Sequence, residues 1–180
     1  GEAYAASGVS YSSGDSQVSF SLDIGGIYPP SAGIRSYRRT YTYDRPLPSE
    51  TDPNRGADSL SPQPVSRIVI RDQYAFLQPE NSIAWNVMTQ KKPQITDSHT
   101  LTIPLSPDTS IHLTGMGADF GIDVETIPLT DPKLLPVWGD TIYRTVLRAR
   151  TGEEGSVSIV LSAVSSSCPA DFQQHEHEGC

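Results

Sequence analysis

Hydrophobic and polar residues alternate with a period of two along most of the chain. In the segment 18–24, polar neighbours separate the apolar side chains of Val18, Phe20, Leu22 and Ile24. Successive side chains of a β-strand point to opposite faces of its sheet, so this alternation predicts a half-buried strand. The same pattern recurs in the segments 34–44, 65–77, 81–95, 99–116, 119–129, 141–150 and 156–164.

Turn signals interrupt this alternation often. The chain has 14 Gly and 15 Pro among 180 residues, which favours short strands over long helices. No segment keeps a period of 3.6, and the stretch 131–140 predicts a loop or one helical turn. Roughly eight to ten short strands with turns between them are typical of packed antiparallel sheets. The sequence therefore predicts an all-β fold, an antiparallel β-sandwich with little helix.

The pattern also predicts how the chain is divided. We expect one β-sandwich domain over residues 1–165, with a long polar surface loop at about 46–64. A polar tail then covers 166–180 and holds both cysteines, Cys168 and Cys180. Their spacing permits one disulfide in an oxidising compartment, whereas in the cytosol they would stay thiols.

The charge and hydropathy of the chain exclude some partners. A net charge of −8 and a pI near 4.8 argue against nucleic acid, whose phosphates require a basic surface. The same balance argues against this chain alone gripping a highly sulfated polysaccharide. No apolar run is long enough to cross a bilayer, so no membrane span is expected.

The densest group of tyrosine and arginine lies in the segment 34–44. Alternation places Tyr37, Arg39, Tyr41 and Tyr43 on one face and Arg38, Thr40 and Thr42 on the other. Such side chains can stack on and hydrogen-bond to sugars, so the candidate sugar-binding residues here are Tyr37, Arg38, Arg39 and Tyr41. An arginine among tyrosines can equally be stacked and paired for structural reasons, and the sequence leaves both interpretations open.

The two tryptophans differ in context. Trp85 belongs to an alternating apolar row with Ile83 and Val87, which indicates a core position. Trp138 stands in the predicted loop, where an exposed indole could stack on a sugar. Because most tryptophans are largely buried, we expect burial of Trp138 over exposure.

Motifs for catalysis or cofactor binding are weak. The chain has no nucleophile elbow, phosphate loop or dinucleotide fingerprint, and no cofactor is expected. His175 and His177 in the tail are metal ligands by type, but a solvated tail explains them better than a built metal site. Carboxylates are frequent, yet nothing in the sequence pairs them for glycoside hydrolysis.

Three stretches in order resemble the C-terminal β region of heparinase II/III-like polysaccharide lyases. They are "LDIGGIYPPSAGIRSYRRTYTYDR" (22–45), "SRIVIRDQYAFLQPENSIAWNVMTQKKPQI" (66–95) and "VETIPLTDPKLLPVWGDTIYRTVLRA" (124–149). The resemblance runs roughly from Val18 to Leu161 and depends on order and spacing. The positions that match the family's pattern are Asp23, Tyr28, Pro29, Tyr37, Arg39, Thr40, Arg45, Arg67, Asp72, Glu125, Asp131, Pro132, Leu134, Trp138, Gly139, Tyr143 and Arg144.

This resemblance implies a lyase activity for the parent enzyme, and we expect the chain alone to lack it. Similar enzymes join an α/α toroid to β-sandwich domains and cleave uronic-acid polysaccharides by β-elimination. Their catalytic and zinc-binding residues precede the part that this chain resembles, so no catalytic or metal residue is carried over. The resemblance therefore implies a non-catalytic domain whose partners are a catalytic toroid and, through the parent enzyme, an acidic polysaccharide.

Trp138 is a further candidate sugar-binding residue because an exposed indole can stack on a sugar, and the resemblance adds Arg144. The resemblance also implies a periplasmic or secreted protein. Two other functions stay open: a stand-alone carbohydrate-binding module and a structural surface sandwich without a ligand. An exposed aromatic platform would favour the binding module. An exposed apolar face left by an absent domain would favour a part of a lyase.

Overall fold

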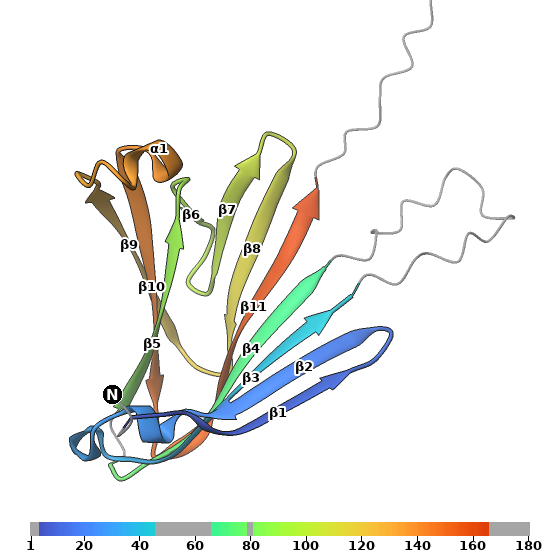
Figure 1. Cartoon of the computed structure of the whole chain (residues 1–180), viewed down its shortest axis with the longest axis vertical. Helices are drawn as coiled ribbons and strands as arrows, with labels where there is room; N and C mark the ends of the chain where they lie inside the picture. The colour runs from blue at the N-terminus through green and yellow to red at the C-terminus, as the bar shows by residue number, and fades with distance from the viewer. Residues whose placement is uncertain (1–3, 46–65, 79–80, 166–180) are drawn as a thin grey trace, which may run out of the picture.

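The computed structural model describes residues 4–45, 66–78 and 81–165, which form two antiparallel sheets packed as a sandwich (Figure 1). The predicted fold class, all-β with little helix, is confirmed. The predicted surface loop at 46–64 and the tail at 166–180 lie outside the described residues. Within the described part of the chain, no helix is long and apolar enough to cross a membrane.

The larger sheet has eight strands. In spatial order they are β1 (Ser7–Ser13), β2 (Gln17–Asp23), β3 (Ile34–Asp44), β4 (Arg67–Phe76), β11 (Glu154–Ser165), β8 (Thr109–Met116), β7 (Thr100–Ser106) and β6 (Gln94–Ile95). Every pairing is antiparallel, and β11, the last strand in sequence, lies in the middle between β4 and β8. The predicted hairpin at 99–116 is confirmed as β7 and β8.

The smaller sheet has three strands, with β10 (Thr141–Thr151) between β5 (Asn81–Thr89) and β9 (Phe120–Pro128). Two 3-10 turns, η1 (Gly25–Ile27) and η2 (Pro30–Ala32), connect β2 to β3. The predicted helical turn in 131–140 is present as the short helix α1 (Leu135–Trp138) between β9 and β10.

One strand was not predicted. β1 is exposed along its whole length, and its sequence, SGVSYSS, lacks an alternating apolar row. Its pairing with β2 shifts between Ser7 and Ser10, where Gly8 adopts a positive φ of 55°. Cross-strand pairing, rather than burial of a side-chain row, therefore defines this strand.

The core lies between the facing sides of the two sheets. Leu147 of β10 is fully buried and pairs with Trp85 of β5 and Ile122 of β9. Across from them, Leu101 of β7 and Leu113 of β8 are fully buried and paired. Since side chains that pair directly across a ladder share a face, the alternation in the sequence becomes one continuous apolar layer.

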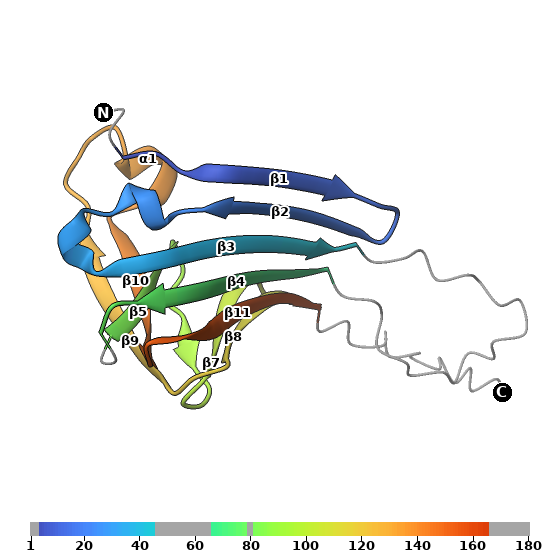
Figure 2. The ribbon, with the colours of Figure 1, turned by 90° about the horizontal axis from the view of Figure 1, so that it is seen from below.

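The large sheet extends beyond the small one. Figure 1 shows the two sheets as the walls of a wedge, and Figure 2 shows that β1 has no strand of the small sheet behind it. On the inner face this leaves exposed Tyr11 (67%), Phe20 (38%), Tyr43 (37%) and Ile68 (41%), with Tyr41 half-buried. Cross-strand pairs link Tyr11 to Phe20, Phe20 to Tyr41 and Tyr43 to Ile68. We call these five side chains the aromatic floor.

Candidate functional site

The segment rich in tyrosine and arginine forms β3, and its two faces are divided as the alternation predicts. Tyr37, Arg39, Tyr41 and Tyr43 lie on the inner face, where β4 contributes the row Tyr74, Asp72, Ile70 and Ile68 opposite them. Arg38 lies on the outer face and donates from Nη2 to the hydroxyls of Ser10 and Ser21 at 3.3 and 2.6 Å. Arg38 therefore shares no surface with the other candidate residues of this strand.

Asp72 is the buried centre of this inner face. It has no exposed surface, and it pairs directly across the ladder with Arg39. Arg39 donates from Nε to Asp72 Oδ1 and from Nη2 to Oδ2, both at 2.7 Å, while the Tyr37 hydroxyl donates to Oδ2 at 2.8 Å. Such two-pronged, charge-assisted contacts are among the strongest hydrogen bonds in proteins. They fix the position of the guanidinium group.

Within this trio of Asp72, Arg39 and Tyr37, the same contacts shift the pKa values of Tyr37 and Arg39. Burial, followed by the nearby Asp72 carboxylate, raises the pKa of Tyr37 well above its ordinary value. The hydrogen bonds to Asp72 likewise raise the pKa of Arg39, against the opposing effect of burial. A tyrosine that acts as a general base needs an accessible phenolate near neutral pH, and these contacts disfavour it. The arrangement of the trio is therefore that of a buried, hydrogen-bonded ion pair that stabilises the fold.

We expect Tyr37→Phe to lower the free energy of unfolding by about 1.5–3 kcal/mol, because it removes a hydrogen bond to a buried charge. The effect has a pH signature. Because the pKa of Tyr37 is raised on folding, its contribution is complete below the unfolded pKa near 10 and is lost as the pH rises through the folded pKa.

Urea unfolding at neutral pH and at successively higher pH, for the wild type and the variant, checks this expectation. The stability difference between the two should shrink above about pH 10. A difference that does not change with pH would contradict the assigned role. Tyr4→Phe is the control, because that tyrosine is exposed (53%).

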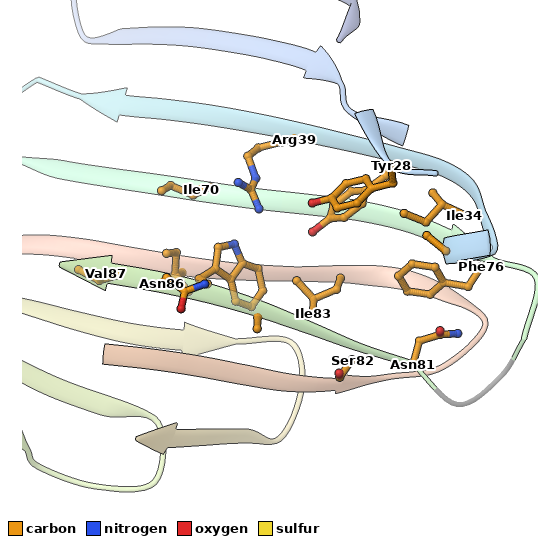
Figure 3. Close-up of a pocket in the computed structure, with 15 residues that line it drawn as sticks. Tyr28, Ile34, Arg39, Ile70, Phe76, Asn81, Ser82, Ile83, Asn86 and Val87 are labelled. Carbon is orange, nitrogen blue, oxygen red and sulfur yellow. The ribbon is translucent and has the colours of Figure 1, made fainter. Parts of the chain in front are cut away.

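A cleft of about 610 Å³ adjoins the trio (Figure 3). One wall comes from the large sheet and the turns beside it. The other wall is β5, and all of the residues 81–87 line the cleft. In Figure 3, Arg39 and Tyr28 lie across the cleft from Asn86 and Ile83 of β5. The wall residues outside β5 are Tyr28, Ala32, Ile34, Tyr37, Arg39, Ile70, Phe76 and Ile159.

Aromatic rings line one end of this cleft. Tyr28 stacks on Tyr37 with ring centres 6.1 Å apart and an angle of 8° between planes. Phe76 meets the edge of Tyr37 and stacks on Tyr74 at 5.0 Å. The Gly-Gly and Pro-Pro pairs that form η1 and η2 bring Tyr28 back over β3.

Trp85 lines the cleft from β5 and carries an unusual polar group. The residue is 5% exposed, which confirms its predicted core position. Its Nε1–H has no hydrogen-bond acceptor among the residues that the structure describes. Buried donors are nearly always paired, so this group marks a place where an acceptor from outside the described chain would fit.

The other predicted residues lie away from the cleft. Trp138 is 39% exposed on α1, so the expectation that it is buried is wrong: α1 carries no buried residue. Arg144 of β10 lies on the outer face of the small sheet and donates from Nε to Glu125 Oε2 at 3.0 Å. The candidates His175, His177, Cys168 and Cys180 lie outside the described residues. In the described ranges no group of His, Cys, Asp or Glu is placed to hold a metal ion.

Sequence reasoning missed two features of this site. Asp72 matched the family-like strand pattern but was not predicted as the partner of Arg39, although both lie in apolar rows that make a buried charge pair plausible. The cleft along β5 left no signal in the sequence, because it arises from how the two sheets pack.

Comparison with solved structures finds the same fold in part of larger enzymes. The heparan sulfate lyase HepC from Pedobacter heparinus matches with a TM-score of 0.60 and 8% identity over 91% of this chain and 22% of its own. A heparinase III matches with a TM-score of 0.54 and 11% identity over 93% and 22%. A second heparinase III, the BT4657 gene product, matches with a TM-score of 0.51 and 12% identity over 89% and 21%.

These matches confirm the resemblance at the level of the fold. The chain is similar to one part of heparinase III-type structures and spans about a fifth of their length. No family model matches the sequence, and no curated protein matches it.

Proposed function

We propose that this chain is a non-catalytic β-sandwich domain of a heparinase-II/III-like polysaccharide lyase that acts on a uronic-acid polysaccharide. Its task is to support the catalytic part of the enzyme and to contribute to the glycan cleft. The observation that carries the proposal is the match to three heparinase structures over about nine tenths of this chain but only a fifth of theirs.

Two features of the chain support a supporting role over a catalytic one. Tyr37, the buried tyrosine of the candidate site, donates to Asp72 and has a raised pKa, which is the opposite of what a proton-abstracting tyrosine needs. The aromatic floor leaves large apolar side chains exposed on the inner face of the sheet. Such a face is typical of a surface that another part of a protein covers.

A contribution to the glycan cleft would come from the exposed candidates. Tyr41 is half-buried, and Trp138 is exposed, whereas Tyr37 is buried beneath Tyr28. Arg39 is committed to Asp72 and Arg144 to Glu125, so neither offers an uncompensated positive charge to a carboxylate. We propose Trp138 as the side chain most able to stack on a sugar ring.

We expect the purified chain to have no lyase activity of its own. Incubation with heparin, heparan sulfate or alginate should give no rise in the ultraviolet absorbance of an unsaturated uronate product. An active lyase on each substrate serves as the positive control. A rise that increases with the concentration of the chain would overturn the non-catalytic assignment.

A second candidate, a stand-alone carbohydrate-binding module, is favoured by the exposed aromatic side chains. Affinity electrophoresis through gels containing heparan sulfate distinguishes such a binding module from a supporting domain of a lyase. Retardation of the isolated chain that Trp138→Ala abolishes, but Leu77→Ala does not, would favour the binding module. Leu77 is a suitable control because it is exposed (66%) and is neither a candidate sugar-binding residue nor part of the aromatic floor. A structural sandwich without a ligand would show neither retardation in the gel nor lyase activity. It would also not raise the activity of a lyase to which it is added.

We further propose a periplasmic or secreted location, because an enzyme of polymeric glycans must meet its substrate outside the cytoplasm. Cell fractionation of the source organism tests it. Recovery of the protein in the cytoplasmic fraction alone would contradict it.

A further inference from the structure

Among the strands that the structure describes, one edge of β5 has no partner. The small sheet runs β5–β10–β9, so β10 pairs with one side of β5, and no strand of the described residues pairs with the other. All of the residues 81–87 line the cleft, although their side chains alternate between the two faces of the sheet. Only the backbone edge of a strand can present a continuous run in this way. The cleft therefore follows a free strand edge for about 20 Å, at 3.4 Å per residue.

No described strand or side chain satisfies the polar groups along this edge. A free strand edge offers alternating N–H and C=O groups, which are a template for another strand. The indole N–H of Trp85, in the middle of the run, also has no acceptor among the described residues. Buried backbone and indole donors are paired in most folded proteins, so an occupant with regularly spaced acceptors fits here.

The free edge faces the uncovered part of the large sheet. In Figure 3 the cleft separates β5 from Arg39, and Ile70 lies on the same far wall. Ile70 pairs with Tyr41, which pairs in turn with Phe20, so the far wall continues directly into the aromatic floor. A strand added to β5 would lie about 4.8 Å beyond it and thus over this floor.

We propose that the free edge of β5 and the aromatic floor form one docking groove for an extended β-strand supplied by the rest of a larger lyase chain. The added strand would pair with β5 and turn alternate apolar side chains onto Tyr41 and Phe20. It would thereby lengthen the small sheet over the part of the large sheet that is now bare. This inference rests on the proposed function, since it takes the strand from the remainder of such an enzyme.

A peptide strand suits this groove better than a glycan does. A free edge repeats its donor and acceptor groups with the period of a strand, and strand addition uses that repeat while alternate side chains enter pockets. An acidic sugar would instead need an uncompensated positive charge. Arg39, the cation of the cleft, already makes a two-pronged ion pair with Asp72.

The comparisons support the remainder of a larger enzyme as the source of the strand. The three matched structures are between four and five times longer than the part that this chain covers. A larger enzyme of that kind has ample polypeptide from which one strand can reach the groove. The uncovered floor is the surface where it would bury apolar area.

Hydrogen exchange read by mass spectrometry tests the proposal. The amide exchange of β5 is compared between this chain alone and the polypeptide encoded by the whole reading frame. We expect the β5 amides that face the cleft to exchange at least about tenfold more slowly in the longer polypeptide. The β10 amides, which are paired in both, serve as an internal reference.

A pair of variants in the longer polypeptide assigns the protection to the groove. Phe20→Lys places a charge on the floor and should return the β5 amides to fast exchange. Phe20 is already 38% exposed in this chain, so we expect the fold to tolerate the change, which unchanged exchange of the β10 amides would confirm. Val137→Lys, at a site that is 69% exposed on α1, should leave the protection unchanged.

The outcomes separate this inference from the proposed function. Equally fast exchange of β5 in both polypeptides would overturn the docking groove and leave the lyase assignment standing. A reading frame that encodes no more than these 180 residues would overturn the assignment, and the source of the strand with it. Slowing of the β5 amides when a heparan sulfate oligosaccharide is added to the isolated chain would show that the groove takes a glycan, and would overturn strand addition.

Discussion

Asp72→Asn is expected to lower the free energy of unfolding by about 3 kcal/mol, because removing one member of a buried ion pair leaves the other charge uncompensated. The carboxylate has no exposed surface and accepts from both Arg39 and Tyr37. Arg39 keeps 22% of its side chain exposed, so water relieves part of the cost and the lower end of the usual range applies. Urea-induced unfolding followed by tryptophan fluorescence measures the change.

An exposed ion pair in the same chain is the matched control. Glu125 and Arg144 are 48% and 43% exposed, so Glu125→Gln should cost less than about 1 kcal/mol. The double variant Arg39→Met with Asp72→Leu should be more stable than Asp72→Asn alone, because no charge is left buried. If Asp72→Asn lowers the free energy of unfolding no more than Glu125→Gln does, the trio does not stabilise the fold as described above.

Leu147→Ala should destabilise the chain by roughly 2–5 kcal/mol, through lost apolar burial and the cavity that remains. Leu147 is fully buried on the central strand of the small sheet, between Trp85 and Ile122. Because β10 joins the two other strands of that sheet, the cavity lies where relaxation is most restricted. Calorimetric or urea unfolding gives the magnitude.

Val137→Ala removes aliphatic groups from a side chain that is 69% exposed, and it should change stability by less than about 0.5 kcal/mol. A similar loss in both variants would mean that the small sheet is not packed as described. A preserved stability in Leu147→Ala would mean the same.

Local alternation was sufficient to predict most of the fold. The row Ile83 to Val87 appears as β5 with its apolar side turned to the core, because a period of two leaves one arrangement that buries it. The row Val18 to Leu22 appears as β2 with its apolar side on the inner face, where Phe20 stays exposed. β1 could not be predicted in this way, since its serine-rich sequence buries nothing and exists as a strand only through its pairing with β2.

The site was predictable only in part. Alternation correctly placed Tyr37 and Arg39 on one face and Arg38 on the other. It could not show that Asp72, beyond the segment 46–65, would lie directly opposite Arg39, because that register depends on a pairing between distant segments. The solvent exposure of Trp138 depends on what α1 packs against, and such tertiary contacts have no local signal.

The order of the strands has a consequence for synthesis on the ribosome. The central strand of each sheet, β10 and β11, is also among the last to be made, whereas their neighbours β4, β5, β8 and β9 emerge earlier. β4 and β8 can pair with β3 and β7 as they emerge, but the two halves of the large sheet join only when β11 is made, and β5 and β9 pair only through β10. Completion of both sheets therefore depends on contacts between distant segments, which makes folding slow. Until then the nascent chain exposes the apolar strands β5 and β9 without their partner, which is the stage at which chaperones would matter most.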